Sequence, residues 1–180
     1  MTTDADRRLL LALARDSIAA HVTRRSAPAP VKAGVMTEFS GAFVTIHNHG
    51  ELRGCIGHVV GDEPLGRLIP QMAVAAASSD PRFPGVTESE LPQLVLEISL
   101  LGPLRPIAGP VDIEIGRHGL VVALGAQRGL LLPQVATEWK WDAETFLAHT
   151  CQKAGLPLDA WRNGASMYRF EAEVFGEEKV

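Results

Sequence analysis

The segment around Cys55 combines residue types that can do chemistry. Residues 52–57 read LRGCIG, a cysteine flanked by glycines in an expected strand. Glycine in a strand marks a bulge or a place where another backbone or a ligand comes close. Arg53 lies two residues before Cys55, so both side chains are expected on one face, where a guanidinium lowers the pKa of a thiol. The segment predicts either a nucleophile, redox thiol or metal ligand, or an inert core cysteine beside bulge glycines.

Two further segments supply polar groups for a site. Residues 80–83 read DPRF, in which Asp80 and Arg82 form either a helix-end salt bridge or a site where Arg82 binds a carboxylate or phosphate. Residues 132–135 read LPQV, where the amide of Gln134 either caps a helix or lines a cleft. In the functional interpretation Cys55 and Arg53 are catalytic, and the ligand-binding residues are Gly54, Gly57, Asp80, Arg82 and Gln134.

The histidines near Cys55 do not predict a metal centre. A two-residue turn pairs Cys55 with Val44, and a three-residue turn pairs it with Phe43. Either pairing leaves His47 about 10 Å or more from the thiol, at ~3.3 Å per residue. His58 is expected on the opposite face of the strand. Zinc needs at least three converging protein ligands, so no metal site is predicted.

Composition argues against several classes of function. The chain has 180 residues and a net charge of −4, with 46% hydrophobic and 6% aromatic residues. The acidic balance argues against nucleic-acid binding, and the few aromatic residues argue against stacking on single strands. No apolar run reaches the length of a membrane span, and no signal segment is visible. Two distant cysteines, Cys55 and Cys151, are typical of a reducing compartment, so we expect a cytoplasmic protein without membrane contact.

Hydrophobic periodicity and turn residues predict an interleaved set of elements. Helices are expected at 4–22, 65–79 and 142–154, and strands at 41–47, 52–57, 94–101, 111–115, 120–124, 129–132 and 168–174. Most strand connections have the length of hairpins, which predicts an α+β fold with antiparallel or mixed sheets. The GxGxxG and P-loop patterns are absent, so the sequence indicates no nucleotide and leaves any cofactor unknown.

Several motifs resemble the AMMECR domain family. Besides LRGCIG, they are GAFVT at 41–45, DPRF at 80–83, IGRHGL at 115–120, GLLLPQV at 129–135 and KAGL at 153–156. They run in order over nearly the whole chain and most resemble the prokaryotic branch called AmmeMemoRadiSam system protein A. The resemblance implies one domain over residues 1–180, with two closely packed subdomains, helices flanking the sheets and a cleft between them. The resemblance also implies that the LRGCIG segment is the functional element.

The resemblance implies two companions, a Memo-like protein and a radical SAM enzyme, and leaves two functions open. The first is an enzyme or cofactor-handling protein that uses Cys55 in the cleft on an unknown small molecule. The second is a non-catalytic adaptor that presents the cleft or the hairpin tip at 48–51 to those companions. The Gly-flanked cysteine beside arginine favours the first, and the lack of a complete catalytic constellation favours the second.

Overall fold

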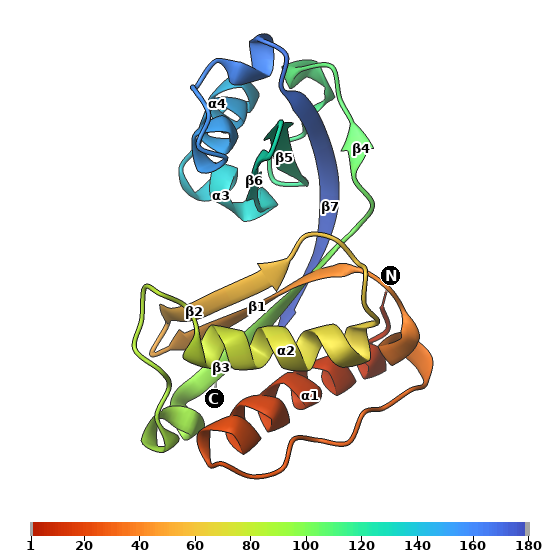
Figure 1. Ribbon diagram of the computed structural model, residues 1–180, viewed down its shortest axis with the longest axis vertical. Coiled ribbons are helices and arrows are strands. Elements are labelled where there is room, and N and C mark those ends of the chain that lie inside the picture. Colours follow the sequence, from red (N-terminus) through yellow and green to blue (C-terminus); the bar gives the residue numbers. More distant parts are fainter. Residues whose placement is uncertain (1, 179–180) are drawn as a thin grey trace. The chain divides into compact units, whose positions relative to one another are not determined.

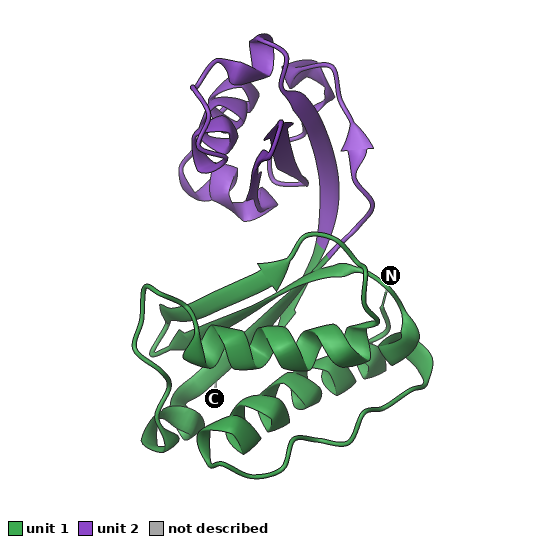
Figure 2. Cartoon of the chain, viewed as in Figure 1, with its two compact units in different colours: residues 1–100, 173–180 green, residues 101–172 purple. Residues whose placement is uncertain are grey.

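The computed structural model describes residues 2–178, which form two compact units (Figures 1 and 2). Unit 1 consists of residues 1–100 and 173–180, and unit 2 of residues 101–172. The chain leaves unit 1 at the end of β3 (Leu94–Leu101) and returns along β7 (Ser166–Gly176), so these two strands belong to both units.

Unit 1 is a sheet covered on one face by two helices, as Figure 1 shows. The helices are α1 (Asp4–Val22) and α2 (Leu65–Ser78), and the strands other than β3 and β7 are β1 (Gly41–Asn48) and β2 (Glu51–His58). Its core joins aliphatic side chains of both layers, among them the fully buried Leu10, Ile46, Ile69 and Ile98. Burial of such side chains stabilises the unit by about 1.5–3 kcal/mol each. Two short 3₁₀ helices, Gly34–Thr37 and Glu88–Gln93, complete the unit.

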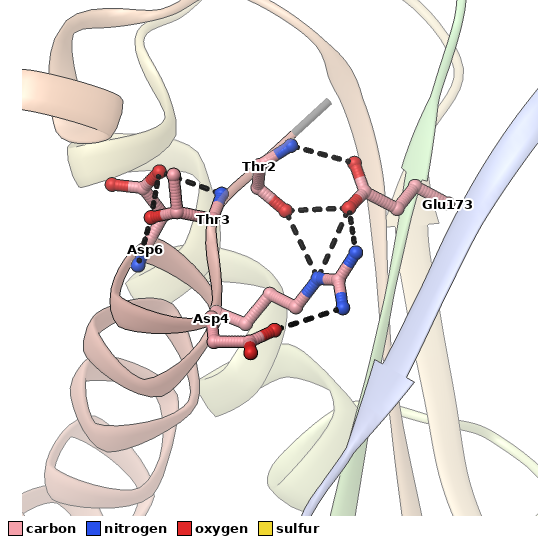
Figure 3. A network of polar contacts seen from close by, with 6 residues as sticks. Thr2, Thr3, Asp4, Asp6 and Glu173 are labelled. Carbon is pink, nitrogen blue, oxygen red and sulfur yellow. Dashed lines mark hydrogen bonds and ion pairs between the residues drawn. The ribbon is translucent and has the colours of Figure 1, made fainter.

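The start of α1 is fixed by polar contacts to β7, drawn in Figure 3. Thr3 caps the helix, because its hydroxyl accepts a hydrogen bond from the backbone N–H of Asp6. The carboxylate of Glu173 on β7 accepts a hydrogen bond of 2.6 Å from the hydroxyl of Thr2 and one of 2.8 Å from the guanidinium of Arg7. Burial opposes ionisation of Glu173, but the bonds from Thr2 and Arg7 outweigh it and lower the pKa of this carboxyl. An ionised Glu173 therefore holds the N-terminal turn on the sheet.

Unit 2 packs helices against a small antiparallel sheet. The further elements are β4 (Arg105–Pro106), β5 (His118–Leu124), β6 (Gln127–Leu131), α3 (Pro133–Glu138) and α4 (Ala143–Lys153). Asp142 caps α4 through the N–H of Thr145, and Gly155 follows it with a positive φ of 74°. Phe146 and Leu147 of α4 are fully buried against Leu120 of β5.

The strands follow the hydrogen-bonded order β2-β1-β3-β7-β5-β6, with β4 pairing β7. The described pairings are antiparallel, and the α+β class expected from the hairpin-length connections is confirmed. No helix in the described part of the chain is both long and apolar enough to pass through a lipid bilayer.

The strand expected at 111–115 is wrong. Residues Pro110–Asp112 form a 3₁₀ turn, and Val111 is 92% exposed. The turn is closed locally, since the carboxylate of Asp112 accepts the N–H of Ala108 at 2.9 Å. Ile113 packs against the core of unit 2, whereas Ile115 is exposed like Val111. The backbone of this segment pairs with no neighbouring strand among the described residues.

Candidate functional site

The β1–β2 hairpin sets the position of the LRGCIG segment. Its turn residues His49 and Gly50 have φ values of 51° and 81°, which is the conformation of a type I′ turn. The register then shifts between Ile46 and His47, and Arg53 is the extra residue of a bulge. The glycine-rich segment indicated such an irregularity, but not its position.

The bulge moves Cys55 to a different partner from the expected one. Cys55 lies opposite Thr45, so both predicted pairings are wrong. The pairing with Val44, which follows from the two-residue turn, is off by the one residue that the bulge inserts. The hydroxyl of Thr45 donates a hydrogen bond to the sulfur of Cys55, with an Oγ1–Sγ distance of 3.2 Å. Nothing in the sequence indicated that Thr45 contacts Cys55, because this contact depends on the register of the two strands.

Asp80 fixes the outer edge of β2 from the end of α2. Its carboxylate accepts the backbone N–H of Cys55 at 3.0 Å and the backbone N–H of Arg82 at 3.1 Å. The same carboxylate binds the guanidinium of Arg82 through two bonds of 3.0 and 2.8 Å. These bonds hold the pKa of Asp80 far below its usual range, with the Arg82 guanidinium as the main cause. Asp80 is only 4% exposed, so the ionised carboxylate lies inside the fold.

Arg53 is engaged elsewhere and does not contact the thiol. Its Nε donates to Glu90 at 2.8 Å, and its Nη1 donates to the carbonyl oxygen of Pro84 at 2.8 Å. The Arg53 guanidinium and the backbone N–H of Thr87 lower the pKa of Glu90 to about 2. Glu90 is a partner that the sequence did not indicate, since it lies 37 residues further along the chain.

Burial raises the pKa of the Cys55 thiol. The hydroxyl of Thr45 and the charge of Arg82 oppose this effect, whereas Asp80 and Glu97 add to it. The expected lowering of the thiol pKa by Arg53 is therefore wrong, because the Arg53 guanidinium forms an ion pair with the carboxylate of Glu90. The thiol of Cys55 is neutral at neutral pH.

The two glycines have packing partners within unit 1. A side chain at Gly54 would overlap the carbonyl oxygen of Ala76 on α2, and one at Gly57 would overlap the ring of Phe43. The hypothesis of a close backbone approach therefore holds for Gly54. In this structure, the space that a side chain would occupy is filled by the protein itself.

The predicted site residues fall into two groups. Cys55, Asp80 and Arg82 form one hydrogen-bonded network in unit 1, and Arg53 with Glu90 forms a second ion pair there. Gln134 lies half-buried on α3 in unit 2 and takes no part in these bonds. Within residues 2–178, no three histidine, cysteine or acidic side chains cluster closely enough to hold a metal ion. The network of unit 1 thus presents a neutral thiol beside a half-exposed, permanently charged guanidinium.

The sequence of this chain is similar to those of known proteins. The model of the AMMECR1 family matches residues 11–175. A protein of Methanosarcina barkeri is 43% identical over 189 residues, covering 99% of this chain and 94% of its own length. A protein of Methanocaldococcus jannaschii is 47% identical over 152 residues, covering 79% of this chain and 76% of its own length.

The structure also has a solved counterpart. The crystal structure of an uncharacterized protein from Pyrococcus horikoshii superposes with a TM-score of 0.91 at 40% sequence identity. The similarity covers 98% of this chain and 94% of that one. The chain belongs to the AMMECR1 family. The family membership and the α+β fold expected from the motifs are thereby confirmed.

Proposed function

We propose that the protein is a non-catalytic binding subunit whose contact surface is centred on Arg82, which the buried Asp80 holds in place near Cys55. One observation carries this proposal. The Arg82 side chain is 55% exposed, and Asp80 binds it through Nε and Nη2. Its Nη1 has no hydrogen-bond partner among the described residues, so it is available to an acidic group of a partner. Asp80 orients the guanidinium and reduces the entropy that binding would otherwise cost.

The state of the thiol argues for binding rather than nucleophilic catalysis. A catalytic cysteine needs a lowered pKa or an adjacent base, whereas burial raises the pKa of Cys55. Asp80 is a poor base, because its pKa lies far below neutrality. A neutral thiol serves instead as a small, weakly polar contact.

The partners in this proposal are the Memo-like protein and the radical SAM enzyme that the family resemblance implies, acting with this chain in the cytoplasm. An acidic side chain of either protein would complete the contact with Arg82. Binding through a half-exposed charge adds mainly to association rate and specificity, so the complex should weaken as salt rises.

The test measures affinity for each purified companion by biolayer interferometry. Arg82→Ala should weaken binding at least about tenfold, the effect of losing a charge-assisted hydrogen bond. Arg67→Ala is the matched control, because Arg67 is an exposed arginine of the same unit, 69% accessible. Equal affinities for wild type and Arg82→Ala, or no binding of either companion at micromolar concentrations, would refute the proposal.

A second candidate is an enzyme or cofactor-handling protein that uses Cys55. Burial raises the pKa of Cys55, but the Thr45 hydroxyl and the Arg82 charge oppose this rise, and this opposition is the support for thiol chemistry. Cys55→Ser separates the candidates. A variant that binds its companions normally but loses function in cells supports the thiol chemistry, and one that keeps both supports the binding subunit.

A further inference from the structure

A cavity of about 220 Å³ lies within unit 2, apart from the Cys55 network of unit 1. It lies where β4, β5 and β7 adjoin, and its lining residues are Gly102, Pro103, Arg105, His118, Arg169, Phe170 and Glu171. All of them belong to unit 2, the purple part of Figure 2. The volume is below that of a drug-sized pocket, typically about 300–1,000 Å³, and matches a small ligand or one chemical group.

Two arginines of the lining are direct cross-strand neighbours. Arg105 of β4 lies opposite Arg169 of β7 in the antiparallel pair. Opposite residues in such a pair project from the same face, so the two like charges are held close together. This arrangement is unfavourable in the unliganded protein unless a negative charge lies between them.

Neither arginine is neutralised by a carboxylate among the described residues. The guanidinium of Arg169 donates a hydrogen bond to the backbone carbonyl of Asp112, which carries no net charge. No ion pair of Arg105 occurs within residues 2–178, and its side chain is exposed. Glu171 is the acidic member of the lining, and it is already paired with Arg117 at 2.8 Å. The cavity therefore retains an excess of positive charge.

His118 adds a hydrogen-bond donor to this charge. It is 6% exposed, and its Nδ1 accepts the backbone N–H of Glu114 at 2.9 Å. The neutral ring consequently carries its proton on Nε2. Burial, together with the charges of Arg169 and Arg117, lowers the pKa of His118 and keeps the ring neutral at pH 7.

We propose that this cavity binds a phosphate group, carried by free phosphate or by a small phosphate ester. Two guanidinium groups and one imidazole N–H supply several hydrogen-bond donors to a tetrahedral oxyanion. The planar guanidinium of arginine is well suited to binding phosphate in this way. The bound anion would also relieve the repulsion between Arg105 and Arg169. This site is independent of the binding surface proposed on unit 1.

The experiment is isothermal titration calorimetry of the full chain at pH 7, with inorganic phosphate and with glycerol phosphate at constant ionic strength. Wild type should bind at least one of them with a dissociation constant below about 1 mM, a modest affinity for a single small group. Arg105→Ala should lose at least about tenfold in affinity. Arg128→Ala, which removes an exposed arginine of β6 in the same unit, should bind as wild type does.

The two probes distinguish the sources of the phosphate group. Glycerol phosphate bound tenfold more tightly than inorganic phosphate identifies an ester, and equal or weaker binding identifies free phosphate. A second readout is thermal stability, because phosphate should raise the melting temperature of wild type and not that of Arg105→Ala. Arg105→Ala should not melt below wild type in phosphate-free buffer, since the substitution removes a like-charge contact. Absence of binding up to 10 mM of both probes, on the order of ten times the expected constant, or equal binding by wild type and Arg105→Ala, would overturn the proposal.

Discussion

Removal of the Asp80 carboxylate tests the network that positions Cys55. In Asp80→Ala the backbone N–H of Cys55 loses a charged acceptor, which costs about 1.5–3 kcal/mol for a partly buried donor. The ion pair with Arg82 adds at most about 1 kcal/mol, because that guanidinium is half exposed and screened by solvent. We expect a loss of about 3 kcal/mol in the free energy of unfolding of unit 1.

The two units can be followed separately. All three tryptophans, Trp139, Trp141 and Trp161, belong to unit 2, so fluorescence during urea unfolding reports on that unit. Hydrogen exchange measured by mass spectrometry resolves β1 and β2 of unit 1 from β5 of unit 2. A loss of 3 kcal/mol should speed exchange of the slowest β1 and β2 amides about a hundredfold or more. Exchange in β5 should stay unchanged.

Comparison with Asp80→Asn separates the charge from the hydrogen bonds. The amide keeps an acceptor oxygen for Cys55 but has no negative charge, so we expect roughly half the loss seen with alanine. The folded-state pKa of Asp80 is depressed, so its ionic stabilisation is complete above the unfolded value near 4 and is lost as pH falls through the folded value. Urea unfolding followed by circular dichroism should therefore show wild type and Asp80→Asn converging between pH 7 and pH 2.

Asp62→Ala is the matched control, because Asp62 is an aspartate of the same unit that is 59% exposed. It should change the free energy of unfolding by less than about 0.5 kcal/mol. Wild-type protection of β1 and β2 in Asp80→Ala, or a difference between wild type and Asp80→Asn that does not depend on pH, would refute the account of the network.

Three further outcomes follow from the same unit. Burial raises the pKa of Cys55, so its alkylation, read by mass spectrometry, should be slow at pH 7 and reach half its maximal rate above pH ~8.5. The buried Cys151 is the internal control and should react more slowly. Half-maximal reaction of Cys55 below pH ~7 would contradict this expectation. Gly54→Ala should lose about 2 kcal/mol in urea unfolding, because its side chain would overlap the backbone of α2. Gly85→Ala should lose little, because the nearest atom to its added methyl group lies 4.0 Å away; equal losses in the two variants would count against this packing. Glu90→Gln should lower the free energy of unfolding by about 1–2 kcal/mol at pH 7. The loss should become progressively smaller from pH 4 towards pH 2, where wild-type Glu90 also becomes neutral. A loss that does not depend on pH would exclude a role of the charge.

Local sequence signals determined most elements of the fold. The capping Asp142 and the left-handed Gly155 predicted both ends of α4, and the period-2 pattern of β3 predicted its buried face. The turn around His49 and Gly50 predicted the hairpin. These signals act within a few residues, so they are readable without the rest of the molecule. The ordered motifs likewise determined the family.

The electrostatic surroundings of Cys55 depended on tertiary structure. Asp80 reaches Cys55 across 25 residues, and Glu90 reaches Arg53 across 37, because α2 and the segment after it pack against the edge of β2. Spacing along the chain predicts that Arg53 and Cys55 share one strand face. It does not show which carboxylate lies nearest to Arg53.

A bulge or a turn can change the meaning of a correct pattern. The one-residue bulge at Arg53 placed Thr45, not Val44, opposite the thiol. The alternating residues 111–115 became a turn and an extended segment, since Pro110 donates no hydrogen bond and Asp112 closes the loop locally. The sequence thus determined the elements and the residues available for chemistry, whereas the packing of those elements decided the register, the ion pairs and the neutral state of the thiol. Those three depend on long-range contacts, which a linear pattern does not contain.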